Sequence, residues 1–111
     1  MDSRLLSGTM ETLLLEVISG GPTYGYEITQ SVLDRSRGYF EITEGSLYPA
    51  LHRLERQKFL ESFWKEADGR GRKYYRLTPA GRAALAAKKK EWRQFASGVQ
   101  GILGGADGMA Q

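Results

Sequence analysis

Residues 44–55 constrain most strongly what this chain can fold into. Leu47, Leu51 and Leu54 recur there at helical spacing, which predicts a short helix with one face turned into a core. The side chains that fall away from this apolar stripe are those of Ser46, Tyr48, His52, Arg53 and Arg56. Hydroxyl, imidazole and guanidinium groups can bond to base edges and phosphates, so this face suits a nucleic-acid groove. The alternative is a surface helix that only covers the core.

Two segments with alternating residues and large aromatics, 60–67 and 72–77, favour β-strands. The turn expected between them, residues 68–71, reads Asp-Gly-Arg-Gly and leads into further basic residues. Closing the hairpin over these four residues predicts that Trp64 lies opposite Tyr75 and Glu66 opposite Lys73. A helix followed by a basic hairpin is the outline of a winged helix-turn-helix, a mainly α fold with a small β-hairpin.

The segment before this helix predicts two more. Apolar residues from Met10 to Ile18 follow the spacing of an amphipathic helix, which a Gly-Gly-Pro sequence ends. Thr23 is expected to cap a second helix over residues 24–36. Residues 39–42 are expected to be extended and to pair briefly with the hairpin. Thr43 is a suitable cap for the helix that follows.

A long helix is predicted after the hairpin, over residues 79–103, because Thr78 can cap it and Pro79 suits its first position. Its near-heptad apolar stripe consists of Leu85, Trp92, Phe95, Val99 and Ile102. No later element can cover this stripe, so it packs either on the first helix or on a second copy of the chain. The large indole of Trp92 favours a homodimer. Residues 104–111 are expected to form a flexible tail.

Length and composition narrow the classes of function. A chain of 111 residues predicts one domain, made of a winged-helix part (1–78), a dimerisation helix (79–103) and the tail. Cysteine is absent and His52 is the one histidine, which excludes disulfides and Cys-based zinc sites and leaves only carboxylates as ligands for a protein-only metal site. No metal or cofactor is expected. His52 has no evident nucleophile partner, and an enzyme is not expected. The chain has no apolar run of membrane-spanning length and no signal-like start, which predicts a cytoplasmic protein without a membrane partner.

Charge is distributed unevenly along the chain. Residues 1–51 carry three basic and seven acidic side chains, whereas residues 52–93 carry thirteen basic and five acidic ones. A basic half is what contact with phosphates requires, although an ordinary solvated surface explains the asymmetry equally well.

The candidate contacts to double-stranded DNA come from three places. Arg53 can reach guanine or phosphate, Ser46 can bond to a phosphate or base, and Tyr48 offers a ring and a hydroxyl. Basic residues of the hairpin would touch phosphate and position the protein without reading sequence. Tyr24 would touch the DNA backbone or pack in the core. The full predicted set is Tyr24, Ser46, Tyr48, Pro49, Arg53, Arg70, Arg72 and Lys73.

Three motifs in this order resemble the PadR family of bacterial transcriptional regulators. They read GPTYGYEI at residues 21–28, EGSLYPALHRLE at 44–55 and GRKYYRLT at 71–78, and the likeness covers residues 5–103. The resemblance implies a winged-helix domain, a dimer formed through the C-terminal helix, and repression by operator binding. The short C-terminal part is similar to the small branch of the family.

The resemblance also bears on two single residues. The family often has glycine where this chain has Lys58, and a glycine there would end the helix in a left-handed turn. In multidrug-sensing members a tryptophan at the position of Trp92 lines a pore at the dimer interface and stacks on planar drugs; the alternative role is interface packing.

The sequence thus predicts a homodimeric DNA-binding repressor with a pseudo-palindromic operator, released by a small planar aromatic ligand that binds at Trp92. The alternative is a winged-helix protein-interaction module that does not bind DNA.

Overall fold

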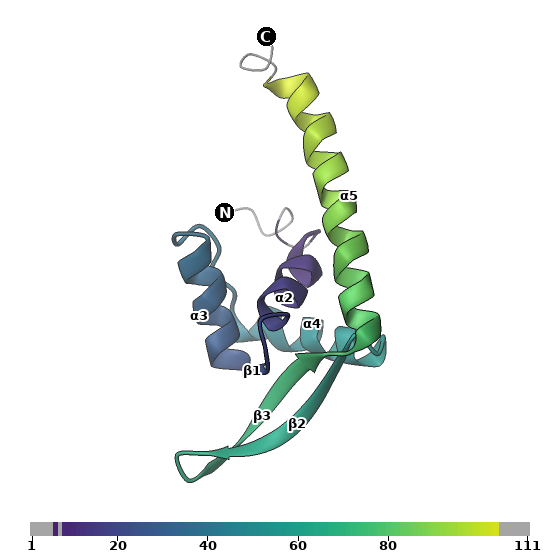
Figure 1. The fold of residues 1–111 in the computed structure, drawn as a ribbon. Coiled ribbons are helices and arrows are strands. Elements are labelled where there is room, and N and C mark those ends of the chain that lie inside the picture. The colour runs from purple at the N-terminus through teal and green to yellow at the C-terminus, as the bar shows by residue number, and fades with distance from the viewer. Residues whose placement is uncertain (1–5, 7, 105–111) are drawn as a thin grey trace.

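The helices and strands of the fold lie within residues 6 and 8–104, the part of the chain that the computed structural model describes (Figure 1). In chain order they are α2 (Met10–Ile18), β1 (Thr23–Tyr24), α3 (Gly25–Arg35), α4 (Glu44–Arg56), β2 (Leu60–Ala67), β3 (Arg70–Leu77) and α5 (Pro79–Leu103). The strands form an antiparallel sheet in the order β1-β3-β2. A mainly helical fold with a β-hairpin is therefore confirmed.

The hydrophobic core lies between α2, α3, α4 and the base of the sheet. Its most deeply buried large side chains are Leu14, Leu15, Ile18, Ile28, Leu47, Leu51 and Leu54. The predicted stripe of α4 is confirmed, and the fully buried Ala50 extends it. Burial of each such leucine contributes about 1.5–3 kcal/mol, so this stripe fixes which face of α4 is left for solvent.

Side-chain caps set the starts of α4 and α5. The Ser46 N–H donates to the Thr43 hydroxyl at 3.3 Å, and the Gly81 N–H donates to the Thr78 hydroxyl at 3.0 Å. Both caps were expected from the sequence, because threonine satisfies an amide that the first helical turn leaves unbonded. The Thr78 hydroxyl also donates to the Lys58 carbonyl at 2.6 Å, which joins the start of α5 to the end of α4.

Helix α4 ends in a left-handed residue. Lys58 has φ 67°, its N–H donates to the Glu55 carbonyl at 2.9 Å, and the Phe59 N–H donates to the Leu54 carbonyl at 3.0 Å. This pair of bonds is the Schellman arrangement that closes many helices, usually on glycine. The turn therefore forms although lysine occupies the glycine position.

The hairpin register differs from the prediction. Trp64 pairs with Lys73 and Ala67 with Arg70, so the turn holds two residues, Asp68 and Gly69, and not four. Asp68 has φ 54° and Gly69 φ 76°, and two successive positive φ angles are characteristic of the type I′ hairpin turn. An Asp-Gly pair adopts these φ angles readily. As a result β3 begins at Arg70, two residues earlier than expected. Because the shift is two residues, each side chain keeps its predicted face.

The third strand also departs from the prediction. Residues 39–42 form no strand; Thr23 and Tyr24 pair with Tyr75 and Tyr74 of β3. Thr23 consequently lies in a strand and does not cap α3, which begins after Tyr24. The buried Thr23 hydroxyl donates to the Glu27 carboxylate of α3 at 2.8 Å. The hydroxyl that was expected to accept from the first turn of the helix is therefore bonded to a side chain of that helix. Pairing of β1 ties the start of α3 to the hairpin.

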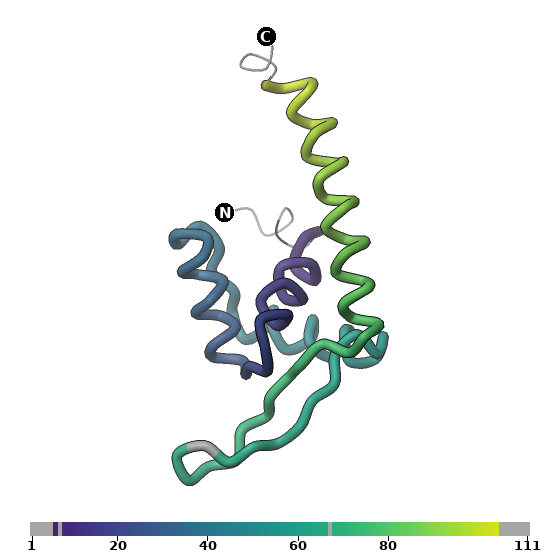
Figure 2. The backbone as a smooth tube through the Cα atoms, viewed as in Figure 1, coloured from purple at the N-terminus to yellow at the C-terminus, as the bar shows by residue number. Residues whose placement is uncertain are grey.

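Helix α5 projects far beyond the rest of the fold (Figure 2). The protein measures 57 × 28 × 21 Å along its principal axes. Near its start α5 packs on α2 and β3 and buries Leu85, whereas its distal half extends past the other elements. The tail predicted for residues 104–111 lies, after Gly104, outside the described residues.

Candidate nucleic-acid interface

The solvent side of α4 is centred on Gly45, Pro49, His52 and Arg56. At roughly 100° per residue these positions lie opposite the buried stripe, and all four are exposed. His52 and Arg56 are exposed as predicted, but neither belongs to the predicted DNA-binding set. The buried leucines could have identified both residues, because they fix the opposite face of the helix.

Arg53 lies at the edge of this surface that faces α2. Its Nε donates to Glu11 Oε2 at 3.3 Å, and its side chain is half exposed. Ser46 occupies the same edge and is exposed. These two predicted residues are therefore placed apart from the hairpin, on the α2 side.

Tyr48 lies at the opposite edge of α4, against the start of α3. A Cβ atom added at Gly25 would overlap with the Tyr48 hydroxyl, so glycine at this position lets the tyrosine lie across the start of α3. Tyr48 nevertheless remains 40% exposed. The phenol is held in place while part of its ring and hydroxyl stay open to a ligand.

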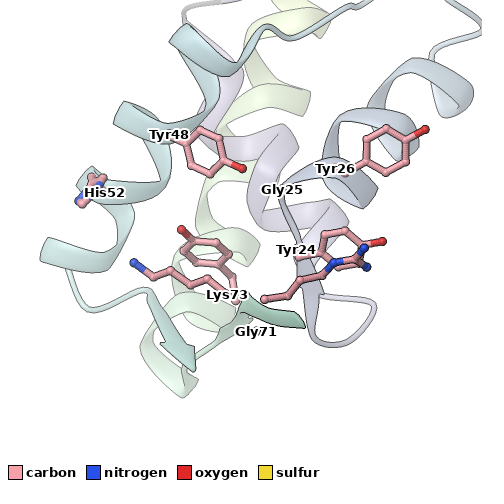
Figure 3. Close-up of a pocket in the computed structure, with 9 residues that line it drawn as sticks. Tyr24, Gly25, Tyr26, Tyr48, His52, Gly71 and Lys73 are labelled. Atoms are coloured by element: carbon pink, nitrogen blue, oxygen red, sulfur yellow. The ribbon is translucent and has the colours of Figure 1, made fainter. Parts of the chain in front are cut away.

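An open cleft of about 630 Å³ separates α4 from β3 and the start of α3 (Figure 3). Its lining residues are Tyr24, Gly25, Tyr26, Tyr48, His52, Gly71, Arg72, Lys73 and Tyr75. Four of the predicted DNA-binding residues meet here, together with His52. Phenol, imidazole, guanidinium and ammonium groups can all donate to phosphate oxygens, so the cleft can accept a polyanionic backbone.

Aromatic rings hold the cations on one face of the hairpin. The Arg72 guanidinium lies 4.4 Å from the centre of the Tyr24 ring, and the Lys65 ammonium lies 5.4 Å from that of Tyr74. Tyr74 meets Tyr24 edge-on at 5.3 Å and stacks on Phe63 at 5.8 Å. Cation–π contacts restrict the side chain but leave the N–H groups of the cation able to donate. Arg72 is thus oriented beside the cleft.

Lys73 is held by an acidic and a phenolic neighbour on the other face. Its Nζ lies 3.8 Å from Glu55 Oε1, while the Ser62 hydroxyl donates to Glu55 Oε2 at 2.6 Å. Burial raises the pKa of Tyr75 to about 12, and the nearby Glu55 carboxylate and Tyr48 phenol add to the effect. The Tyr75 phenol therefore stays neutral at ordinary pH, and Lys73 is the cation at this wall of the cleft.

The outer hairpin carries one large aromatic residue that sequence reasoning assigned only to a strand. The Trp64 side chain is 70% exposed and lies over Gly71. Arg70, directly after the turn, is exposed as predicted. An exposed indole beside basic groups is unusual enough to make Trp64 a further candidate contact residue.

The distal half of α5 presents an apolar surface to solvent. Its exposed members are Trp92, Phe95, Val99, Ile102 and Leu103. The rings of Trp92 and Phe95 lie 6.1 Å apart and are tilted by 34°. Lys88 and Lys89 form ion pairs with Glu11 and Glu16 of α2, so these two ammonium groups are engaged on the α2 side.

A three-helix core with an exposed third helix beside a basic, antiparallel hairpin defines a winged-helix protein of the helix-turn-helix class. Comparison with known proteins assigns the family: the chain belongs to the PadR-like family of transcriptional regulators, whose model matches residues 14–87. This is a family of regulators, not of enzymes.

Individual relatives agree with this assignment. A transcriptional regulator of Mycobacterium tuberculosis is 39% identical over 88 residues, which is 79% of each chain. A transcriptional regulator of Clostridium thermocellum is similar in structure, with a TM-score of 0.85, 29% identity, and coverage of 90% of this chain and 98% of its own. A PadR-like transcriptional regulator of Bacillus cereus has a TM-score of 0.80 and 32% identity, with coverage of 92% of this chain and 98% of its own.

Among the described residues, no helix is both long and apolar enough to cross a membrane.

Proposed function

We propose that this protein is a DNA-binding transcriptional repressor that acts as a homodimer in the cytoplasm. The observation that carries the proposal is the cleft between α3, α4 and β3, where polar groups from these elements and from β1 converge. The side chains at its wall are cationic or hydrogen-bonding, and the hairpin beside it exposes Arg70. Duplex DNA supplies the matching chemistry, a regular array of phosphates flanking base edges.

Within this proposal α4 enters the major groove and the hairpin touches the flanking backbone. His52 and Arg56 face the base edges, and Pro49 on the same face of the helix provides an apolar contact to a thymine methyl group. Tyr24, Tyr48, Arg72 and Lys73 contact phosphate through the cleft. Ser46 and Arg53 read the side of the groove nearest α2.

The proposed dimer forms through the distal half of α5. Its apolar side chains are exposed, and a second copy of the helix offers the same surface. Two copies related by a twofold axis present two α4 helices, so the operator is a pseudo-palindrome with half-sites roughly 34–36 Å apart.

A small planar aromatic compound is the proposed effector. Trp92 and Phe95 offer adjacent ring faces, and two copies would enclose a flat apolar slot. Quenching of tryptophan fluorescence by planar dyes measures such binding. The quenching should be lost in Trp92→Ala and kept in Trp64→Ala, because these are the two tryptophans of the chain.

The test of DNA binding compares Arg72→Ala with Lys90→Ala. Both variants lose one positive charge, but Arg72 lines the cleft whereas Lys90 lies on α5. With an operator selected from random duplexes, Arg72→Ala should weaken operator and non-operator DNA alike and lower the salt dependence by about one ion. Lys90→Ala should bind as wild type does.

Two outcomes count against the proposal. Equal losses in the two variants would mean that the cleft has no special part in binding. An absence of salt-dependent duplex binding in the wild type would favour the alternative, a winged-helix module that contacts only proteins.

A further inference from the structure

Two carboxylates of α2 each hold cations from two other helices. Glu16 accepts from Lys89 of α5, with Nζ to Oε1 2.9 Å, and lies 3.6 Å from the Arg35 guanidinium of α3. The hydrogen bond from Lys89 lowers the pKa of the Glu16 carboxyl. Glu16 therefore ties together three helices that do not include α4.

Glu11, at the start of α2, makes a comparable pair of contacts but reaches α4. Its Oε2 accepts from Arg53 Nε at 3.3 Å, and its Oε1 lies 3.8 Å from Lys88 Nζ of α5. The Glu11 side chain is 25% exposed, so water screens these contacts only in part. Arg53–Glu11–Lys88 is thus a continuous chain of charges from α4 to the proposed dimerisation helix.

Guanidinium geometry makes the choice of donor important. An arginine that reads guanine uses two parallel N–H groups, and this fork must point along the base edge. When Nε is bound by a carboxylate, the end-on pair of N–H groups, one on each terminal nitrogen, points in a different direction and can still donate. A carboxylate on Nε therefore fixes the direction of the fork before any base is present, much as an outer carboxylate fixes a metal-binding histidine.

We propose that Glu11 is a positioning residue for DNA sequence recognition, holding Arg53 so that its terminal nitrogens face one base pair. Lys88 holds the other carboxylate oxygen and so links this orientation to α5. The inference rests on the proposed DNA binding. It adds that one acidic residue, which DNA would repel, increases the discrimination between sequences.

The Arg53→Gln variant first identifies the base pair that Arg53 distinguishes, as the one whose change no longer affects binding. The experiment then measures the ratio of two affinities, that for the operator divided by that for the same duplex changed at this base pair. Loss of one negative charge strengthens both affinities, so a general charge effect cancels in the ratio. Glu11→Gln should lower the ratio by about two- to fivefold, the range of exposed ion pairs. The matched control Glu16→Gln removes the same charge from the same helix and should leave the ratio unchanged.

The Arg53–Glu11–Lys88 contacts lead to two further expectations about the affinity ratio. In an Arg53→Gln background, Glu11→Gln should have no additional effect on the ratio, since no fork remains to be oriented. Lys88→Gln should lower the ratio by less than Glu11→Gln, whereas Lys89→Gln should not change it. An effect of Glu11→Gln that persists without Arg53, or an equal effect of Glu16→Gln, overturns the proposal.

A measurement without DNA separates this inference from the function on which it rests. The NMR signal of the Arg53 Nε–H should shift and exchange faster with water in Glu11→Gln and stay in place in Glu16→Gln. An Arg53 signal unaffected by Glu11→Gln overturns the positioning role whatever the affinities show. A wild type that binds no duplex overturns the proposed function, even if that signal moves as expected.

Discussion

Replacing Lys58 by glycine should stabilise the fold. A residue other than glycine in the left-handed conformation costs about 1–2 kcal/mol, and Lys58 has φ 67° at the end of α4. Glycine removes this cost but makes the unfolded chain more flexible by about 0.5–1 kcal/mol. The net gain is about 0.5–1 kcal/mol, because the two closing hydrogen bonds and the bond from Thr78 to the Lys58 carbonyl involve only the backbone of residue 58.

Thermal and urea unfolding measure this gain. The melting temperature should rise by about 2–6 °C, with wild type and variant compared at equal concentration of chain. Lys58→Ala is the control, since it removes the exposed side chain and keeps the unfavourable conformation. The reasoning fails if Lys58→Gly is no more stable than wild type, or if Lys58→Ala is stabilised equally.

Three further outcomes follow from packing, ionisation and exposure. Gly25→Ala should destabilise the fold by about 1–3 kcal/mol in urea unfolding, and Tyr48→Phe should restore part of the loss, because the closest clash is with the Tyr48 hydroxyl. Since the pKa of Tyr75 is raised to about 12, its contribution to stability should be complete below pH 10 and lost between pH 10 and 12; Tyr75→Phe should lack this part of the pH profile in alkaline unfolding. Val99→Glu, at a side chain 37% exposed on α5, should give folded monomers in sedimentation while the wild type sediments as a dimer. A monomeric wild type would contradict the last expectation.

The helices could be predicted from the sequence because their signals are local. Thr43 and Thr78 cap the helices that they were expected to cap, and the leucine stripe of α4 faces the core as its spacing requires. The hairpin register was wrong by two residues because four polar or small residues were counted as the turn, although Asp68-Gly69 alone can close it.

Other features depend on contacts that no local pattern contains. A strand of two residues is too short to alternate, so β1 could not be distinguished from the start of α3. The bond between Glu11 and Arg53 joins residues 42 positions apart and became visible only once α2 and α4 were placed together. His52 and Arg56 are different, because helical periodicity alone could have identified these exposed residues as candidate DNA contacts.

The junction between α4 and α5 has a mechanical consequence. A Cβ atom at Gly81 would collide with the Phe59 carbonyl, and the Thr78 N–H donates to that same oxygen at 3.1 Å. Backbone therefore meets backbone where Gly81 approaches Phe59, and the two helices are closely joined there.

If α4 and α5 turn as one rigid unit, a displacement of the far end of α5 is passed on to α4. The 25 residues of α5 span roughly 37 Å, so a sideways shift of about 4 Å at its far end corresponds to a turn of about 6° at the joint. Carried along the 13 residues of α4, that turn moves the opposite end of the helix by about 2 Å, more than half the rise of one base pair. Modest movements of the distal half of α5 would then be enough to shift α4 into or out of alignment with the major groove.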